Sequence, residues 1–250
     1  MIHLFNEVLY SPLLNLLVFF YNIFPFADLG LAILLLTLVI RLVLWPLSEK
    51  ALRSQKAMQA IQPKISALKE KYKKDPSKLA QATMAIYKEN KVNPFSYIFL
   101  LLIQLPILLA VYQVFRNGLI SKNLATDLYG FIHNPGVLNV LSFGVLDLSK
   151  PNLILTLITG LLQYRQGKML TTIQHLPNIA KKEGAKDETV MAIMNKQMIF
   201  MMPILTVFIG LGLPSGLMLY WLIGLVLTII QQKLSFRKLP SGDKSVKPSS

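Results

Sequence analysis

Residues 28–46 of this 250-residue chain read DLGLAILLLTLVIRLVLWP. The stretch is apolar over almost the length that a membrane-spanning helix needs, which is about 20 residues, and its interior holds a single charge, Arg41. The whole chain has the same bias, because 53% of its residues are hydrophobic and only 15% are charged. Soluble domains carry about 25% charged residues. We therefore expect an integral membrane protein.

The basic residues are concentrated in a few segments. Of the 26 Lys and Arg residues, eleven lie in residues 46–94, six in 165–196 and five from Lys233 onward, whereas residues 1–28 have none and 116–150 have three. Segments rich in Lys and Arg stay on the cytoplasmic side of a membrane. The pattern therefore predicts five crossings, with the N-terminus outside and the C-terminus inside.

These signals predict an all-α membrane protein made of five transmembrane helices, an N-terminal interfacial helix and a cytoplasmic helical hairpin. In order, we expect an external interfacial helix over residues 1–27, a first crossing over 28–49, the cytoplasmic hairpin over 50–93, a second crossing over 95–116, an external loop with short interfacial helices over 117–151, a third crossing over 152–173, a cytoplasmic loop over 174–196, a fourth crossing over 197–213, a fifth over 217–233 and a basic cytoplasmic tail over 234–250. A sixth crossing is the alternative for residues 8–27, where Ser11-Pro12, Asn15 and Asn22 interrupt the apolar run.

The cytoplasmic hairpin is predicted from helical periodicity. Apolar residues recur every three or four positions in Met58–Leu68 and again in Leu79–Tyr87, which indicates two helices that each have one apolar face. The break between them falls at Asp75-Pro76, with Ser77 as the expected helix cap.

The last three crossings look short. The apolar run Leu153–Leu162 spans only about 15 Å at about 1.5 Å per residue, so its helix must continue through Gln163–Gln166. Met198–Leu213 and Leu217–Ile230 span about 24 Å and about 21 Å by the same rise. Because the hydrocarbon core is about 30 Å thick, these lengths predict local thinning of the bilayer.

Arg41 is the strongest candidate for a functional residue. It lies roughly 8–12 Å inside the cytoplasmic boundary by helical rise, where an isolated charge is costly and usually faces a partner or a water-filled cavity. Every Asp and Glu lies in a loop, terminus or boundary, so no carboxylate is available inside a crossing to pair with it. Gln104, Gln163 and Gln166 are the polar residues that could form a groove with Arg41. The alternatives are that Arg41 reaches the inner headgroups and that Gln104 only bonds a neighbouring helix.

Several chemistries are excluded. The chain has no cysteine, its three histidines are scattered, and it contains no Walker loop, GxSxG or HExxH sequence. An ion-coupled transporter needs an acidic residue or an equivalent ion site within the membrane. We therefore expect no enzyme, cofactor or metal. A small-solute transporter or channel stays an alternative, although the lack of an acidic residue within the crossings and of an internal repeat argues against it.

Six stretches, found in order along residues 8–237, resemble the YidC/Oxa/Alb family of membrane protein insertases. They are Ile40-Arg41 to Trp45-Pro46-Leu47, Gln62-Pro63-Lys64-Ile65, YKENKVNP from Tyr87 to Pro94, LIQLPI from Leu102 to Ile107, Pro214-Ser215-Gly216-Leu217 with Leu219-Tyr220-Trp221, and Ile229-Ile230-Gln231-Gln232. The chain is most similar to the minimal bacterial form, without a large external domain.

This resemblance implies a five-helix bundle around a hydrophilic groove that is open to the cytoplasm and to lipid and closed on the outside. It places Arg41, Gln104 and Trp221 in that groove and gives the cytoplasmic hairpin a role in receiving clients. The chain departs from the family where Phe95-Ser96-Tyr97 replaces a frequent Gly-Gly and where Gly224 replaces a frequent Asn.

The expected function is therefore insertion or chaperoning of membrane proteins in a bacterial plasma membrane. Nascent membrane proteins and the lipid bilayer are the expected partners, with the ribosome, through the basic tail and cytoplasmic loops, and the Sec translocon as further candidates. A passive assembly factor for membrane complexes would use the same groove and stays an alternative.

Overall fold

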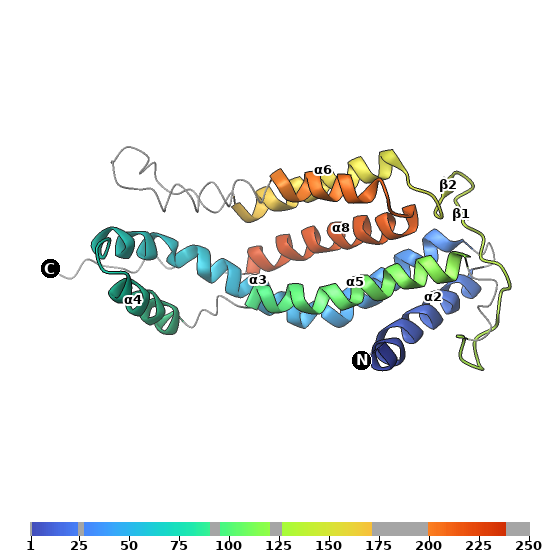
Figure 1. Cartoon of the computed structure of the whole chain (residues 1–250), viewed down its shortest axis with the longest axis horizontal. Coiled ribbons are helices and arrows are strands. Elements are labelled where there is room, and N and C mark those ends of the chain that lie inside the picture. The colour runs from blue at the N-terminus through green and yellow to red at the C-terminus, as the bar shows by residue number, and fades with distance from the viewer. Residues whose placement is uncertain (1, 25–27, 91–95, 121–126, 172–199, 239–250) are drawn as a thin grey trace.

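The computed structural model describes residues 2–24, 28–90, 96–120, 127–171 and 200–238. These residues form helices and one small antiparallel sheet (Figure 1). The elements are α1 (Ile2–Phe5), the π-helix η1 (Asn6–Tyr10), α2 (Ser11–Ile23), α3 (Leu29–Lys71), α4 (Pro76–Glu89), α5 (Ser96–Ile120), β1 (Leu141–Ser142), β2 (Leu146–Asp147), α6 (Leu153–Thr171) and α8 (Ser215–Lys238), and a further apolar helix covers Phe200–Gly210.

Three helical segments in the described part of the chain are long and apolar enough to cross a membrane. They are His3–Ile23, Leu29–Met58 and Ser215–Phe236, while Leu102–Asn117 and Phe200–Gly210 are shorter apolar helices. The chain is therefore a mostly helical integral membrane protein, as its composition predicts.

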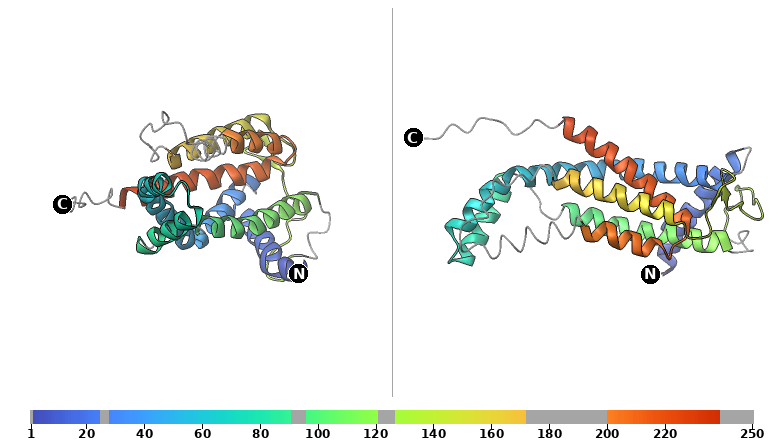
Figure 2. Two further views of the ribbon diagram at one scale, coloured as in Figure 1. Left: turned by 60° about the vertical axis from the view of Figure 1, so that its left-hand side comes forward. Right: turned by 90° about the horizontal axis from the view of Figure 1, so that it is seen from above.

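The first predicted crossing and the first half of the predicted hairpin form one continuous helix. α3 has 43 residues, and Pro46 and Pro63 lie inside it. Its length is about 65 Å at about 1.5 Å per residue, which is about twice the thickness of a hydrocarbon core. Only part of α3 can therefore lie in a bilayer, and the rest projects from the bundle beside α4 (Figures 1 and 2).

The α3–α4 hairpin has a small apolar core of its own. Ile61 and Ile65 are buried, and Ile86 and Tyr87 of α4 pack against them, as the periodicity predicts. The expected cap was wrong, because Asp75 and not Ser77 caps α4. The Asp75 side chain accepts a hydrogen bond from the backbone N–H of Lys78 at 3.0 Å, which satisfies one of the unpaired donors at the start of the helix.

α3 and α8 form the centre of the bundle. α8 packs against α3 on one side and α6 on the other, and α3 also contacts α2 and α5 (Figures 1 and 2). Small residues bring α6 close to the helix Phe200–Gly210, since a Cβ on Gly160 would lie 2.5 Å from Cγ2 of Val207. Close backbone approach of this kind is typical of helices packed in membranes.

The predicted lengths of the last crossings are corrected in one case. α6 continues as a helix through Gln163–Gln166, as predicted. α8 is longer than its apolar run, because its 24 residues span about 36 Å at about 1.5 Å per residue. The fifth crossing is therefore not short, and it no longer supports thinning of the bilayer.

α2 is tied to the loop that follows α5. The Asn15 side chain donates to the carbonyl oxygen of Asp127 at 3.0 Å and accepts from the N–H of Tyr129 at 2.7 Å, and Asn22 donates to the carbonyl oxygen of His133 at 2.7 Å. The two Asn residues that interrupt the apolar run thus hold α2 to this loop, at a steep inclination to the neighbouring helices (Figures 1 and 2).

Residues 127–150 form turns and a β-hairpin where short interfacial helices were expected. β1 and β2 pair Leu141 with Asp147, and the turn between them has positive φ angles of 51° at Phe143 and 72° at Gly144. The Asp28 carboxylate, which also caps α3, accepts from the Ser142 hydroxyl at 2.7 Å and from the Phe143 N–H at 2.6 Å. The hairpin is thereby fixed to the first turn of α3.

Some predictions fall on residues outside the described ranges. These are the Asn93-Pro94 sequence, the loop over 174–196 and the tail from residue 239 onward.

Candidate functional site

Arg41 lies within the apolar segment Leu29–Met58 of α3. The side chains that follow it, Leu42 and Val43, are 57% and 71% exposed, whereas Ile40 before it is buried. Arg41 itself is half-buried. It therefore lies at the boundary between the exposed apolar face of α3 and the interior of the bundle.

The Arg41 guanidinium packs against the backbone of Gly224 on α8. A Cβ on Gly224 would stand 2.8 Å from Nη2, 3.4 Å from Nε and 3.5 Å from Cζ of Arg41. Gly224 is buried, so the guanidinium occupies the space that a side chain would take. A larger side chain at position 224 would therefore meet the guanidinium, which the sequence alone did not indicate.

Tyr220 lies one helical turn before Gly224 and is 4% exposed. Its hydroxyl is close enough to Arg41 to interact electrostatically and is within reach of the Gln104 side chain of α5. The contact with Gln104 lacks ordinary hydrogen-bond geometry, because the hydroxyl has no such partner in the described ranges. Buried polar groups are nearly always hydrogen-bonded, and Gln104 is the described side chain within reach of this hydroxyl.

Arg41 of α3 and Gln104 of α5 each lie near Tyr220 of α8, and Arg41 also packs against Gly224 of α8. We call these four residues the Arg41 cluster. Tyr220 could have been noticed in the sequence, since helical spacing places it and Gly224 on the same face of one helix.

Arg41 has no acidic partner among residues 2–24, 28–90, 96–120, 127–171 and 200–238. The four ion pairs found there join other residues, such as Glu49 with Arg53. Thr37, one turn before Arg41, is fully buried, but its hydroxyl donates to the carbonyl oxygen of Ile33 at 2.6 Å. The guanidinium therefore keeps its capacity to bind an incoming acceptor.

The other predicted groove residues lie apart from this cluster in their contacts. The Gln163 side chain accepts a hydrogen bond from Thr206, so it joins α6 to the helix Phe200–Gly210. Gln166 and Trp221 are half-buried, and no hydrogen bond, ion pair or ring contact among the described side chains joins either of them, or Gln163, to Arg41.

A set of polar contacts on the Pro46 side of Arg41 was not predicted. The Gln231 side chain donates to the Ser48 hydroxyl at 2.8 Å, Ser235 donates to the Glu49 carboxylate, and the Lys56 ammonium donates to the carbonyl oxygen of Phe236 at 3.1 Å. We call these contacts the α3–α8 clasp. They join the C-terminal half of α8 to the part of α3 that leads into the hairpin.

The clasp and the Arg41 cluster share one helix register. Ser48 follows Arg41 by seven residues, and Gln231 follows Gly224 by seven residues. Seven residues make about two helical turns, so each helix presents both of its residues on one face. The second pair lies further along both helices than the first, so α3 and α8 run in the same direction. The clasp therefore fixes the rotation that points Arg41 at Gly224 and Tyr220.

Comparison with known families and proteins supports a single relationship. The model of a family described as "60Kd inner membrane protein" matches residues 19–242. The Arg41 cluster and the α3–α8 clasp both lie inside this match.

Similar curated proteins carry the name "Membrane protein insertase YidC". One from Tolumonas auensis is 35% identical over 92% of this chain and 36% of its own length, and one from Syntrophus aciditrophicus is 34% identical over 88% of this chain and 35% of its own length. This chain thus spans little more than a third of these two relatives. A relative from Clostridium tetani is 33% identical over 82% of both chains.

Proposed function

Because the chain belongs to the 60Kd inner membrane protein family, which the match over residues 19–242 shows, we propose that it inserts client proteins into the membrane. In this proposal it passes transmembrane segments from the cytoplasm into the lipid bilayer of a bacterial plasma membrane, and it also shields them as a chaperone. The observation that carries the proposal is Arg41, a cation inside an apolar helix with no acidic partner in the described part of the chain.

The proposed topology has five crossings, with the N-terminus outside and the C-terminus in the cytoplasm. The α3–α4 hairpin is then cytoplasmic and the β-hairpin external. The distribution of Lys and Arg supports this orientation, since the hairpin segment 46–94 carries eleven of the 26 basic residues and residues 1–28 carry none.

Within this topology the Arg41 cluster forms the polar part of the client path. Arg41 supplies the charge, while Gln104 and Tyr220 supply hydrogen-bonding groups of which the Tyr220 hydroxyl is unpaired in the described ranges. Gln163 and Gln166 are proposed as further client contacts because they are polar residues within a predicted crossing, and Trp221 is proposed on the resemblance alone.

The first step is attraction of an acidic client segment. A carboxylate that approaches Arg41 to about 4 Å gains about 4 kcal/mol at an effective dielectric constant of about 20. This gain offsets part of the cost of removing the polar segment from water.

The second step is lateral release of the apolar client segment. Leu42 and Val43 show that the surface beside Arg41 is apolar and open, so a client helix can leave the cluster without crossing a polar barrier. Its transfer to lipid is favourable by roughly 25 cal/mol for each Å² of apolar surface removed from water. No nucleotide is required by either step.

Nascent membrane proteins and the lipid bilayer are the proposed partners. The ribosome and the Sec translocon are proposed as suppliers of clients, with the basic residues of the cytoplasmic segments as the ribosome contact, because clustered cations favour phosphate binding.

The proposal is tested by reconstituting the purified chain into liposomes with a single-span client made by a cell-free ribosome system. Protease protection of the translocated client segment should rise well above the level in protein-free liposomes. Arg41→Ala should lower this protection for an acidic client. The matched control is Lys50→Ala, which removes an exposed cation from the same helix and should leave client insertion normal. Protection equal to that in protein-free liposomes would contradict the proposal.

A further inference from the structure

We infer that the tip of the β-hairpin, residues Leu141–Val145, is a membrane anchor that lies among the headgroups and upper acyl chains of the outer leaflet. The inference goes beyond client insertion, and it rests only on the proposed orientation of the bundle. It concerns a surface that contacts lipid and not the path of a client.

The hairpin tip is apolar and exposed. Leu141, Phe143 and Val145 are 43%, 67% and 85% exposed, while Ser142 between them is fully buried. Residues 134–146 contain no charged side chain. Exposed apolar side chains gathered on one segment typically mark a surface that binds something, and a loop designed for water would carry charges.

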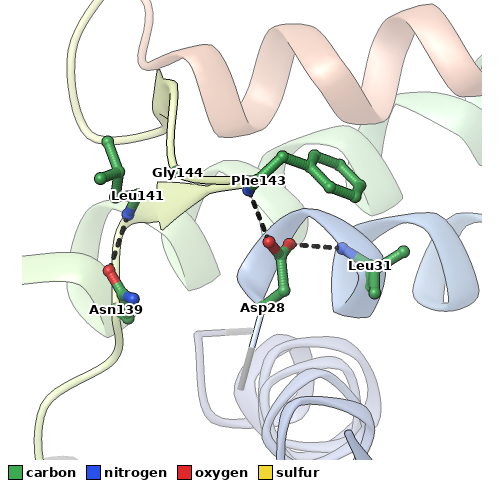
Figure 3. A pocket seen from close by; sticks show the side chains of 6 residues that line it. All are labelled: Asp28, Leu31, Asn139, Leu141, Phe143 and Gly144. Carbon is green, nitrogen blue, oxygen red and sulfur yellow. Dashed lines mark hydrogen bonds between the residues drawn. The ribbon is translucent and has the colours of Figure 1, made fainter. Parts of the chain in front are cut away.

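The depth of the tip is fixed by the start of α3. The Asp28 carboxylate lies at the N-terminus of the apolar segment Leu29–Met58. It accepts hydrogen bonds from the backbone N–H groups of Phe143 and Leu31 (Figure 3). Phe143 therefore lies at the level of the first turn of α3, which is the outer boundary of the apolar segment. Phe and Leu side chains on segments that lie in the membrane interface are buried at this level, between the headgroups and the acyl chains.

The apolar surface of the tip continues into that of α3. A hollow of about 390 Å³ lies beside this joint, and it is lined by Asp28 and Leu31 at the start of α3 and by Asn139, Leu141, Phe143 and Gly144 of the hairpin (Figure 3). Leu34, one turn beyond Leu31, is 42% exposed on the apolar helix. The lipid-facing surface of α3 thus extends to the tip without an intervening charge other than the hydrogen-bonded Asp28, and lipid is the occupant that fits both.

The backbone of the tip is strained at its aromatic residue. Phe143 has φ 51°, in the left-handed region where a bulky residue is strained and Asn or Gly is favoured. Strain of this kind persists where the surroundings enforce it and is common at functional positions. Gly30 shows how tightly the hairpin is held, because a Cβ there would lie 2.0 Å from Oγ of Ser142.

The inference is tested by depth measurement with spin labels. The chain contains no cysteine, so a single Val145→Cys variant can be labelled in the otherwise unchanged protein, in nanodiscs of phosphatidylethanolamine and phosphatidylglycerol. Relaxation by oxygen, which concentrates in lipid, and by a water-soluble nickel complex is compared. Leu34→Cys is the hydrocarbon reference and Lys78→Cys, an exposed residue of α4, is the aqueous reference.

We expect the nickel accessibility of the Val145 label to resemble that of the Leu34 label more than that of the Lys78 label. Phe143→Asn, which suits the left-handed backbone and removes the ring, should raise the nickel accessibility of the Val145 label at least twofold while the Leu34 label is unchanged. A Val145 label as accessible to nickel as the Lys78 label would overturn the anchor. No client takes part, so that outcome would not affect the insertase proposal. A Leu34 label that is not protected from nickel would instead contradict embedding of the bundle.

Discussion

At Gly224 the missing side chain leaves the space that the Arg41 guanidinium occupies, since a Cβ there would stand 2.8 Å from Nη2. The guanidinium ends a flexible side chain, so we expect Gly224→Ala to displace it without unfolding the bundle. Insertion of a client with an acidic translocated segment should fall by about fivefold, the effect of about 1 kcal/mol on a rate. The control is Gly212→Ala, where the added Cβ would meet only the carbonyl oxygen of Ile209 at 3.6 Å. An unchanged insertion rate in Gly224→Ala would show that the position of the guanidinium does not matter.

At Tyr220, one substitution can test the proposed role of the hydroxyl apart from the packing of the ring. Its hydroxyl is buried and lacks an ordinary hydrogen bond in the described residues, so Tyr220→Phe should leave thermal stability unchanged or slightly raised. Insertion of acidic clients should nevertheless decrease, because the hydroxyl is the group available to the client. Thermal unfolding in detergent and insertion in liposomes measure the two effects. A loss of stability with normal insertion would mean that the hydroxyl serves folding alone.

The sequence indicated which residues are candidates for the site better than it indicated which residues they contact. Arg41 and Gln104 were identified because a polar group within an apolar run is costly and therefore informative. Gly224 was not, because a glycine has no side chain to signal that another residue fills its space. Gln163 was placed in the groove by its polarity, whereas its described contact is with Thr206 of the next helix.

At the scale of elements, the Asp28 carboxylate joins α3 to the β-hairpin, and its titration sets the pH range of that joint. Burial raises the pKa of Asp28, but hydrogen bonds from Phe143, Ser142, Leu31 and Gly30 outweigh burial and lower the pKa below its ordinary value of 3.8. A carboxyl with a depressed pKa stabilises the folded form above its unfolded pKa and loses that contribution as pH falls through the folded pKa.

We therefore expect the hairpin to stay fixed from neutral pH down to about pH 4, near the ordinary carboxyl pKa, and to loosen only below it. Mobility of a spin label at Val145 reports the change. Asp28→Asn should loosen the hairpin even at neutral pH, because an amide has only one acceptor oxygen for the Ser142 and Phe143 donors. Loosening that begins near neutral pH in the unchanged protein would contradict the role of Asp28.

The helices themselves were predictable, and the loop was not. Long apolar or periodic runs specify helices directly, so α3, α4, α5, α6 and α8 lie close to the predicted positions. Residues 127–150 lack periodicity, and their hairpin depends on contacts with Asp28 and on a turn with positive φ at Phe143. The continuity of α3 was also missed, because the change from apolar to charged composition suggested a boundary where the backbone continues.

For the whole molecule, topology is the property on which the client path depends. Cysteines introduced at Lys71 or Ser77, on either side of the turn in the α3–α4 hairpin, should react with an impermeant maleimide only from the cytoplasmic side. A cysteine at Val145 should not react from that side. Intact cells and inverted membrane vesicles provide the two orientations. Labelling of Lys71→Cys from outside would reverse the proposed topology.

The arrangement of the bundle follows only partly from the sequence. The number of crossings and their orientation were read from hydropathy and charge, which act on each segment separately. The parallel seam of α3 and α8, with Arg41 beside Gly224 and Ser48 beside Gln231, depends on which faces meet. Hydropathy carries little information on this choice, because lipid-facing and helix-facing side chains are both apolar in a membrane.

If the charge of Arg41 acts on acidic client segments, the insertion of paired clients by Arg41 variants should depend on the charge of the client. The clients differ only in whether the translocated segment carries Asp or the neutral Asn. Arg41→Ala should reduce insertion of the Asp client by about tenfold or more, which corresponds to about 1.4 kcal/mol, and should affect the Asn client much less. Arg41→Lys should keep most activity because the charge is retained, and Arg41→Glu should be worse than Arg41→Ala for the Asp client. Equal loss for the Asp and Asn clients in Arg41→Ala would contradict the account.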